Sequence, residues 1–150
     1  MISNDKDIHL LEQIAKNIRI NTLKGIASAG AGHPGAALSV IEVLVCLYFK
    51  IMKIDPQKPQ WEDRDRLVLS KGHASIGLYS VLAEKGYFPK DELQTFDHVN
   101  SRLQGHPDLT KTPGVDMSCG SLGQGLSAGV GMALAARLQK KDCHIYVLMG

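Results

Sequence analysis

The strongest constraint on the fold is that two short apolar segments each follow stretches of helical periodicity. Residues 67–69 are Leu-Val-Leu and residues 145–149 are Ile-Tyr-Val-Leu-Met, which is the length and composition of buried strands. Strands that alternate with helices are typical of α/β folds with a parallel sheet. The sequence therefore predicts an α/β fold in which both segments lie parallel in one sheet flanked by helices. Two strands are too few for a complete sheet of this kind, so we expect an incomplete fold.

Four stretches have the three- and four-residue apolar spacing of helices. The first is predicted over residues 7–28. The second is predicted from Pro34, a favoured first helical position, to just before Asp55, which precedes a proline. The third follows the first strand and ends at Gly86. The fourth is predicted over residues 120–140, where spaced glycines would let the helix lie very close to a sheet.

Composition excludes several classes of protein. The 150 residues carry a net charge of only +2, with 44% hydrophobic and 21% charged residues, which is typical of an ordinary globular domain. A nucleic-acid or membrane-surface protein would show a large basic excess. The amino terminus lacks the layout of a signal peptide, and the apolar run 43–49 is too short to span a membrane. Three cysteines without a CxxC pair indicate free thiols, so we expect a cytoplasmic protein.

The dipeptide Gly-His occurs three times, with the histidines at His33, His73 and His106. Each could be a polar turn residue without further role. However, His33 precedes a predicted helix, and His73 lies between a predicted strand and a predicted helix. Ligands bind at the carboxyl ends of parallel strands, and helix N-termini attract phosphate. Zinc is a less favoured alternative, because no histidine pair has helical ligand spacing.

A glycine-rich segment, residues 120–125, leads into the fourth predicted helix. Its spacing is GxxGxG, which is neither the dinucleotide pattern GxGxxG nor a P-loop. Backbone amides in such a loop can approach an anionic ligand. A loop that needs glycine only for close helix packing explains the segment equally well. The residues alone therefore indicate an α/β domain with a glycine- and histidine-lined anion pocket.

Four motifs together resemble the amino-terminal region of transketolases, in their order and near their spacing. They are Gly30-Ala-Gly-His33-Pro-Gly35, Leu69-Ser-Lys-Gly-His73-Ala74, Gly105-His106-Pro-Asp108 and Gly120-Ser-Leu-Gly-Gln-Gly125. The resemblance covers residues 19–150 and is strongest to the two-subunit bacterial and archaeal enzymes. A related thiamine enzyme that makes deoxyxylulose phosphate is an alternative within the same class. The third and fourth motifs resemble transketolase more than that enzyme.

The resemblance implies a role for each matched residue. The catalytic residues would be His33, which assists proton movement at the ketose hydroxyls, and His106, which contacts the substrate hydroxyl. The cofactor thiamine diphosphate would be bound by His73 at its diphosphate and by the following loop residues: Gly120, Ser121 and Leu122. Ser121 stands where proline is frequent in the family, which should alter loop stiffness more than chemistry.

The implied reaction transfers a two-carbon ketol group from a ketose phosphate to an aldose phosphate, with the cofactor as electron sink. The family binds magnesium through a Gly-Asp-Gly motif whose first glycine would be Gly150, so the metal ligands are expected beyond residue 150. Residues 1–150 would then be the front part of the diphosphate-binding domain, inactive alone. The implied partners are a carboxy-terminal transketolase subunit and a second copy of the chain. The alternative, from a different functional class, is a catalytically inactive remnant of such an enzyme that binds a partner subunit or a ligand.

Overall fold

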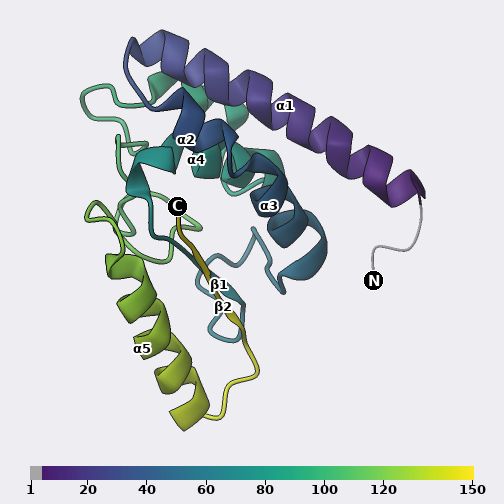
Figure 1. Cartoon of the computed structure of the whole chain (residues 1–150), viewed down its shortest axis with the longest axis vertical. Helices are drawn as coiled ribbons and strands as arrows, with labels where there is room; N and C mark the ends of the chain where they lie inside the picture. Colours follow the sequence, from purple (N-terminus) through teal and green to yellow (C-terminus); the bar gives the residue numbers. More distant parts are fainter. Residues whose placement is uncertain (1–4) are drawn as a thin grey trace.

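The computed structural model of the chain describes residues 5–150. Two parallel strands lie between helical layers (Figure 1). In chain order the elements are α1 (Asp5–Ala29), α2 (Pro34–Leu38), α3 (Ile41–Cys46), the π-helical turn η1 (Leu47–Ile51), β1 (Arg66–Leu69), the 3-10 turn η2 (Gly72–Ala74), α4 (Ser75–Lys85), the 3-10 turn η3 (Lys90–Thr95), α5 (Gln124–Leu138) and β2 (Ile145–Leu148).

The sheet confirms the predicted parallel pairing. β1 and β2 pair in register from Arg66 opposite Ile145 to Leu69 opposite Leu148. Successive side chains of a strand point to opposite faces. On one face, Leu69 and Leu148 belong to the main core, and on the other, Val147 meets α5. The sheet is therefore covered by α5 on one face and by the α1–α4 layer on the other (Figure 1).

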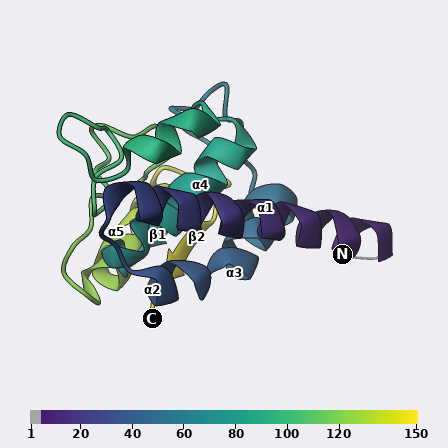
Figure 2. The ribbon, with the colours of Figure 1, turned by 90° about the horizontal axis from the view of Figure 1, so that it is seen from above.

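Helix α1 follows the predicted stretch closely and runs across α3 and α4 (Figure 2). Its buried residues recur every three or four positions: Ala15, Ile18, Thr22 and Gly25. This spacing places them on one face, which packs against α4. At Thr22, burial of the hydroxyl is compensated by a hydrogen bond that it donates to Ser80 Oγ, 3.0 Å away.

The second predicted helix is wrong as a single element, because it divides into α2, α3 and η1. The chain leaves helical hydrogen bonding at Ser39, whose Oγ donates to the Ala36 carbonyl at 3.0 Å. Just before the break, Ala37 packs so closely on α4 that a Cβ at Gly77 would lie 2.9 Å from its carbonyl oxygen. The break thus lets α2 approach α4 while α3 packs against α1.

By length and composition, the stretch Pro34–Ile51 is apolar enough to cross a membrane. In the structure it is divided into the three elements just described. Four of its large side chains are almost fully buried in the protein core: Ile41, Leu44, Val45 and Tyr48. These four side chains pack within the fold, whereas Val43 and Ile51 of the same stretch are about half exposed.

The fourth predicted helix starts later than expected, at Gln124 rather than at residue 120. Gly123 has a φ of 81°, a left-handed conformation that no right-handed helix contains. The prediction that spaced glycines let this helix lie close to the sheet is confirmed at Gly125 and Gly129, which are buried against the strands. Helix α5 therefore lies close to both strands, because neither glycine carries a side chain there.

Candidate functional site

His33 and His73 are brought together from two motifs separated by 39 intervening positions in the chain. His33 precedes Pro34 at the start of α2, and His73 lies in η2, just after the carboxyl end of β1. Their ring centroids are 5.3 Å apart in an edge-to-face arrangement. The site therefore lies where the sequence predicts it, at the carboxyl end of a parallel strand.

His106 reaches the same place from the segment between residues 97 and 119, which contains no helix or strand within the described chain. Backbone carbonyls of that segment accept hydrogen bonds from α4. Ser75 Oγ donates to Gly105 O at 2.7 Å, and Tyr79 Oη donates to Gln104 O at 3.0 Å. These two bonds hold the segment on α4 immediately before His106.

Gly72 explains how closely the three motifs approach one another. A Cβ at Gly72 would lie 2.9 Å from His106 Cδ2 and 2.7 Å from the carbonyl oxygen of Cys119. Side chains essentially never approach backbone this closely. The glycine of the second Gly-His motif is therefore needed for the third motif and the glycine-rich loop to pack beside η2.

The three histidines line one cavity of about 530 Å³. The other residues that line it are Ala31, Gly32, Phe96, Asp97, Gln104, Gly105, Asp108 and Lys111. A volume of this order is in the range that accommodates a small-molecule ligand. The convergence of His33, His73 and His106 on one cavity agrees with the sequence-based expectation of a shared site.

The glycine-rich loop lies next to this cavity but does not line it. Gly120 lies 4.0 Å from His106 Cδ2, measured from the position its Cβ would take. Ser121 and Leu122 are exposed, and neither is among the residues that line the cavity. The loop is anchored at its end, where the Gly125 N–H donates to Ser70 Oγ at 3.0 Å. Gly120, Ser121 and Leu122 therefore form a rim beside the histidines.

Positive charges lie close to His73 within the site. Partial burial, and then the positive charges of His33, Lys71 and His106, lower the pKa of His73. A lowered pKa keeps the imidazole neutral near pH 7, so it can donate one hydrogen bond without carrying a charge. An approaching anion would reverse part of this effect, because it stabilises the protonated ring.

Lys71 was not among the site residues expected from the sequence. The residue is only 8% exposed, and its Nζ donates to Ser39 Oγ at 3.1 Å. Its position between Ser70 and the Gly-His pair was a usable signal, because it directly follows a predicted buried strand. Asp97, Gln104 and Lys111 were also missed, and only the fold shows that they line the cavity.

The donors present fit a phosphorylated cofactor better than a metal ion alone. Within residues 5–150 there is no cluster of three histidine, cysteine or acidic side chains that could hold a metal. The three imidazoles and the Lys111 ammonium that line the cavity suit an anionic ligand, as do the tight glycine turns, and the Asp97 and Asp108 carboxylates lie in the same lining. The residues that could hold a diphosphate are His73, Lys71 and the backbone of the glycine-rich loop.

Comparison with known proteins agrees with this geometry. Residues 10–145 match the family described as the thiamine diphosphate binding domain of transketolase. The chain is 51% identical over 140 residues to the 6-deoxy-6-sulfo-D-fructose transketolase subunit of Clostridium sp. (strain MSTE9). It is 46% identical over 142 residues to an apulose-4-phosphate transketolase subunit of Actinobacillus succinogenes. Each alignment covers 93% of this chain and 51% of the relative, so the chain spans about half the length of these curated relatives.

Solved structures give the same result for the fold. Transketolase from Pichia stipitis, in complex with sedoheptulose 7-phosphate, superposes with a TM-score of 0.88 at 36% identity, over 93% of this chain and 22% of that one. Transketolase from Campylobacter jejuni superposes with a TM-score of 0.87 at 35% identity, over 95% of this chain and 23% of that one. These similarities confirm the α/β fold and the predicted resemblance. The chain therefore belongs to the family of transketolase thiamine diphosphate-binding domains.

Proposed function

We propose that this chain is the amino-terminal part of a diphosphate-binding domain in an enzyme that transfers a two-carbon ketol group from a ketose phosphate to an aldose phosphate. The observation that supports this most directly is the convergence of His33, His73 and His106 on one cavity at the end of β1. The relatives described above are transketolases or their subunits, which favours ketol transfer over a deoxyxylulose phosphate synthase-like reaction.

Each histidine has a distinct part in this proposal. His73 donates a hydrogen bond to the diphosphate of thiamine diphosphate, since it lies nearest the strand end and the buried Lys71. His33 and His106 are exposed on the cavity wall, where they contact substrate hydroxyls and move protons between them and solvent. Thiamine diphosphate, when bound, supplies the electron sink for the carbon chemistry. Gly120, Ser121 and Leu122 shield one side of it from water.

The proposal includes partners outside residues 1–150. We expect the domain's magnesium ligands beyond residue 150, as the family resemblance implies. Relatives named as transketolase subunits support a carboxy-terminal partner subunit. A second copy of the chain completes the assembly. Residues 1–150 alone are accordingly expected to show no ketol transfer.

The proposal is tested by a coupled assay of the protein assembled with its carboxy-terminal subunit, supplied with thiamine diphosphate, magnesium, a ketose phosphate and an aldose phosphate. We expect turnover that His33→Ala and His106→Ala lower by about 100-fold or more. His9→Ala is the matched control, because His9 is an exposed histidine on α1, outside the cavity, whose ring contacts Glu12. Cofactor binding without turnover would instead indicate an inactive remnant.

A further inference from the structure

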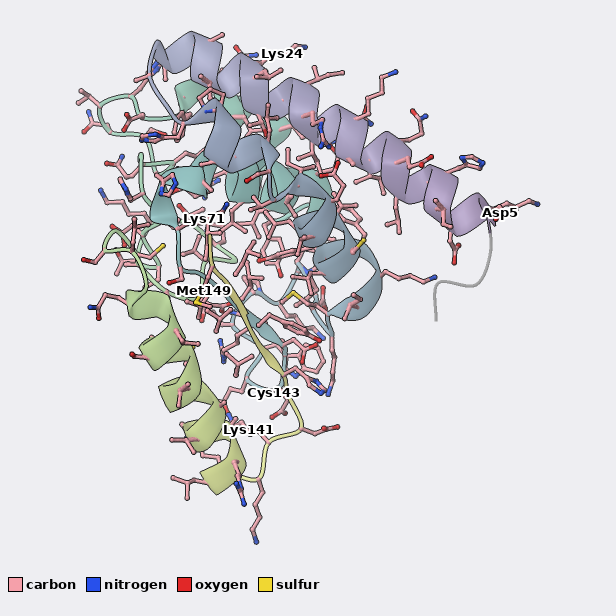
Figure 3. All side chains as sticks on the ribbon, in the orientation of Figure 1. Asp5, Lys24, Lys71, Lys141, Cys143 and Met149 are labelled. Atoms are coloured by element: carbon pink, nitrogen blue, oxygen red, sulfur yellow. The ribbon has the colours of Figure 1, made fainter. Side chains whose placement is uncertain are left out.

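Asp97 lies where the histidine cavity continues into a second cavity. This second cavity, of about 710 Å³, is lined by residues 98–102 together with Asp97, Gln104 and Lys111. The last three residues also line the histidine cavity, so the two cavities adjoin along them. The segment that carries all of these residues lies beside the end of the sheet that Lys71 marks in Figure 3. A ligand held in the histidine cavity can therefore extend past Asp97.

The side chain of Asp97 is held by the backbone just before His106. The Gly105 N–H donates to Asp97 Oδ1 at 3.1 Å, and a Cβ at Gly105 would lie 3.0 Å from the same oxygen. The Asp97 N–H in turn donates to the Leu103 carbonyl at 2.8 Å. Its φ of 55° is left-handed, a conformation that aspartate tolerates better than most residues. The carboxylate is therefore fixed beside the peptide unit that leads into His106.

The Asp97 carboxylate keeps most of its hydrogen-bonding capacity for a ligand. A carboxylate has about four acceptor sites, and within residues 5–150 that of Asp97 accepts only the bond just described. Asp108, the other carboxylate of the histidine cavity, accepts bonds from the N–H and hydroxyl of Thr110, at 2.9 and 2.7 Å, and from Ser118 Oγ at 3.4 Å. Asp97 is thus the more available of the two acidic groups in this cavity.

The three residues that line both cavities suit hydroxyl groups. The Asp97 carboxylate accepts hydrogen bonds, the Lys111 ammonium donates them, and the Gln104 amide does both. A hydroxyl group also donates and accepts, so a carbon chain that carries several hydroxyls matches this set. A phosphoryl group carries negative charge, which the Asp97 carboxylate repels. The position next to Asp97 therefore favours the hydroxyl-bearing part of a sugar over its phosphate.

We infer that Asp97 is a specificity-determining residue of this site, whose carboxylate accepts hydrogen bonds from hydroxyl groups of the bound sugar. The inference rests on the proposed function, which places the reacting end of the sugar beside His33 and His106. The carbons that follow then extend toward Asp97, where the two cavities adjoin. Loss of a hydrogen bond to a charged group corresponds to binding that is weaker by about 10- to 100-fold. The contact therefore selects aldoses long enough to bring a hydroxyl to Asp97.

The test compares two uncharged acceptors, glycolaldehyde and D-erythrose, so that only their hydroxyl groups differ in reach. The hydroxyl of glycolaldehyde lies next to the reacting carbonyl, whereas D-erythrose carries further hydroxyls along its chain. The protein is assembled with its carboxy-terminal subunit, thiamine diphosphate, magnesium and a saturating ketose phosphate. Asp97→Asn should lower kcat/KM for D-erythrose by about 10-fold or more and leave that for glycolaldehyde unchanged.

The Asn variant separates contact with the sugar from support of the loop. Asparagine keeps an oxygen for the Gly105 N–H and tolerates the left-handed φ, so the position of His106 is preserved. Asp91→Asn is the matched control, because Asp91 is an exposed carboxylate of η3 that lines neither cavity. Equal kcat/KM of Asp97→Asn and wild type for D-erythrose would overturn the inference. Equal losses with both acceptors would also overturn it, because they would show that Asp97 only positions His106.

A binding measurement separates the inference from the proposed function. If the wild type transfers no ketol group, the proposed function fails, and the amide resonance of Gly105 then tests the inference in titrations with D-erythrose. We expect the sugar to shift that resonance in the wild type at concentrations about 10-fold lower than in Asp97→Asn. An unchanged resonance, or equal concentrations in the two proteins, would overturn the inference. Turnover by the wild type with no effect of Asp97→Asn would overturn the inference alone.

Discussion

Substitution of two glycines in α5 by alanine provides a direct test of how that helix packs on the sheet. Gly129 faces β2, and a Cβ there would overlap Val147 Cγ2. Gly131 lies two positions further on, and a Cβ there would have no neighbour within 4 Å. Both residues are inside the same helix, so both substitutions change intrinsic helix propensity alike.

The expected free-energy changes follow from these contacts. Replacing an interior helical glycine by alanine stabilises a helix by about 1 kcal/mol, which is the whole effect expected for Gly131→Ala. Gly129→Ala gains the same amount but must displace Val147, a β-branched side chain with little rotamer freedom. Overpacking of this kind costs about 1–3 kcal/mol. Since the propensity gain is common to both variants, we expect Gly129→Ala to be less stable than Gly131→Ala by about 1–3 kcal/mol.

Urea unfolding followed by far-ultraviolet circular dichroism measures this difference. Equal slopes of free energy against urea concentration would show that the two variants unfold over comparable surface areas. The comparison is internal to one helix, so effects on the rest of the protein largely cancel. If both variants were stabilised to the same extent, the close contact between α5 and β2 would be refuted.

Three further expectations concern the site and its support. His73→Ala should weaken thiamine diphosphate binding more than His33→Ala, which should mainly lower kcat; equal cofactor affinities in calorimetry would contradict this division. Asp116→Asn should lower the free energy of unfolding by about 3–5 kcal/mol in urea titrations, because it leaves the buried Arg64 guanidinium, 2.5 Å from the carboxylate, unpaired. Burial raises the pKa of the Cys119 thiol to about 11, so iodoacetamide at pH 8 should alkylate it far more slowly in the folded protein than in the urea-unfolded protein. The alkylation rate of the folded protein should rise as the pH approaches 11, and similar rates at pH 8 in both states would contradict the burial of Cys119.

Local patterns were sufficient for the strands and for most helix positions. Residues 67–69 and 145–149 are short apolar runs, and both pair as predicted, although β2 ends at Leu148. The break after α2 could not be predicted, because the apolar spacing continues through it. It accompanies the close approach of Ala37 to Gly77, a contact between residues far apart in the sequence.

For the candidate site, too, the sequence predicted some of the residues and missed others. Three Gly-His pairs indicated His33, His73 and His106, and the fold brings all three to one cavity. The burial of Lys71 could not be foreseen, because it depends on Ser39 from the turn after α2 and on the chain after β2. Such a cation is recognised only when the surrounding elements are placed around it.

We expect thiamine diphosphate to bind at the carboxyl ends of β1 and β2. A crystal structure of the protein with thiamine diphosphate tests it most directly, through the distance between the His73 imidazole nitrogens and the diphosphate oxygens. The expected result is a hydrogen bond of about 2.7–3.2 Å, with the diphosphate beside η2 and the Gly120–Gly123 turn. A diphosphate bound elsewhere on the chain, with His73 facing solvent, would contradict it.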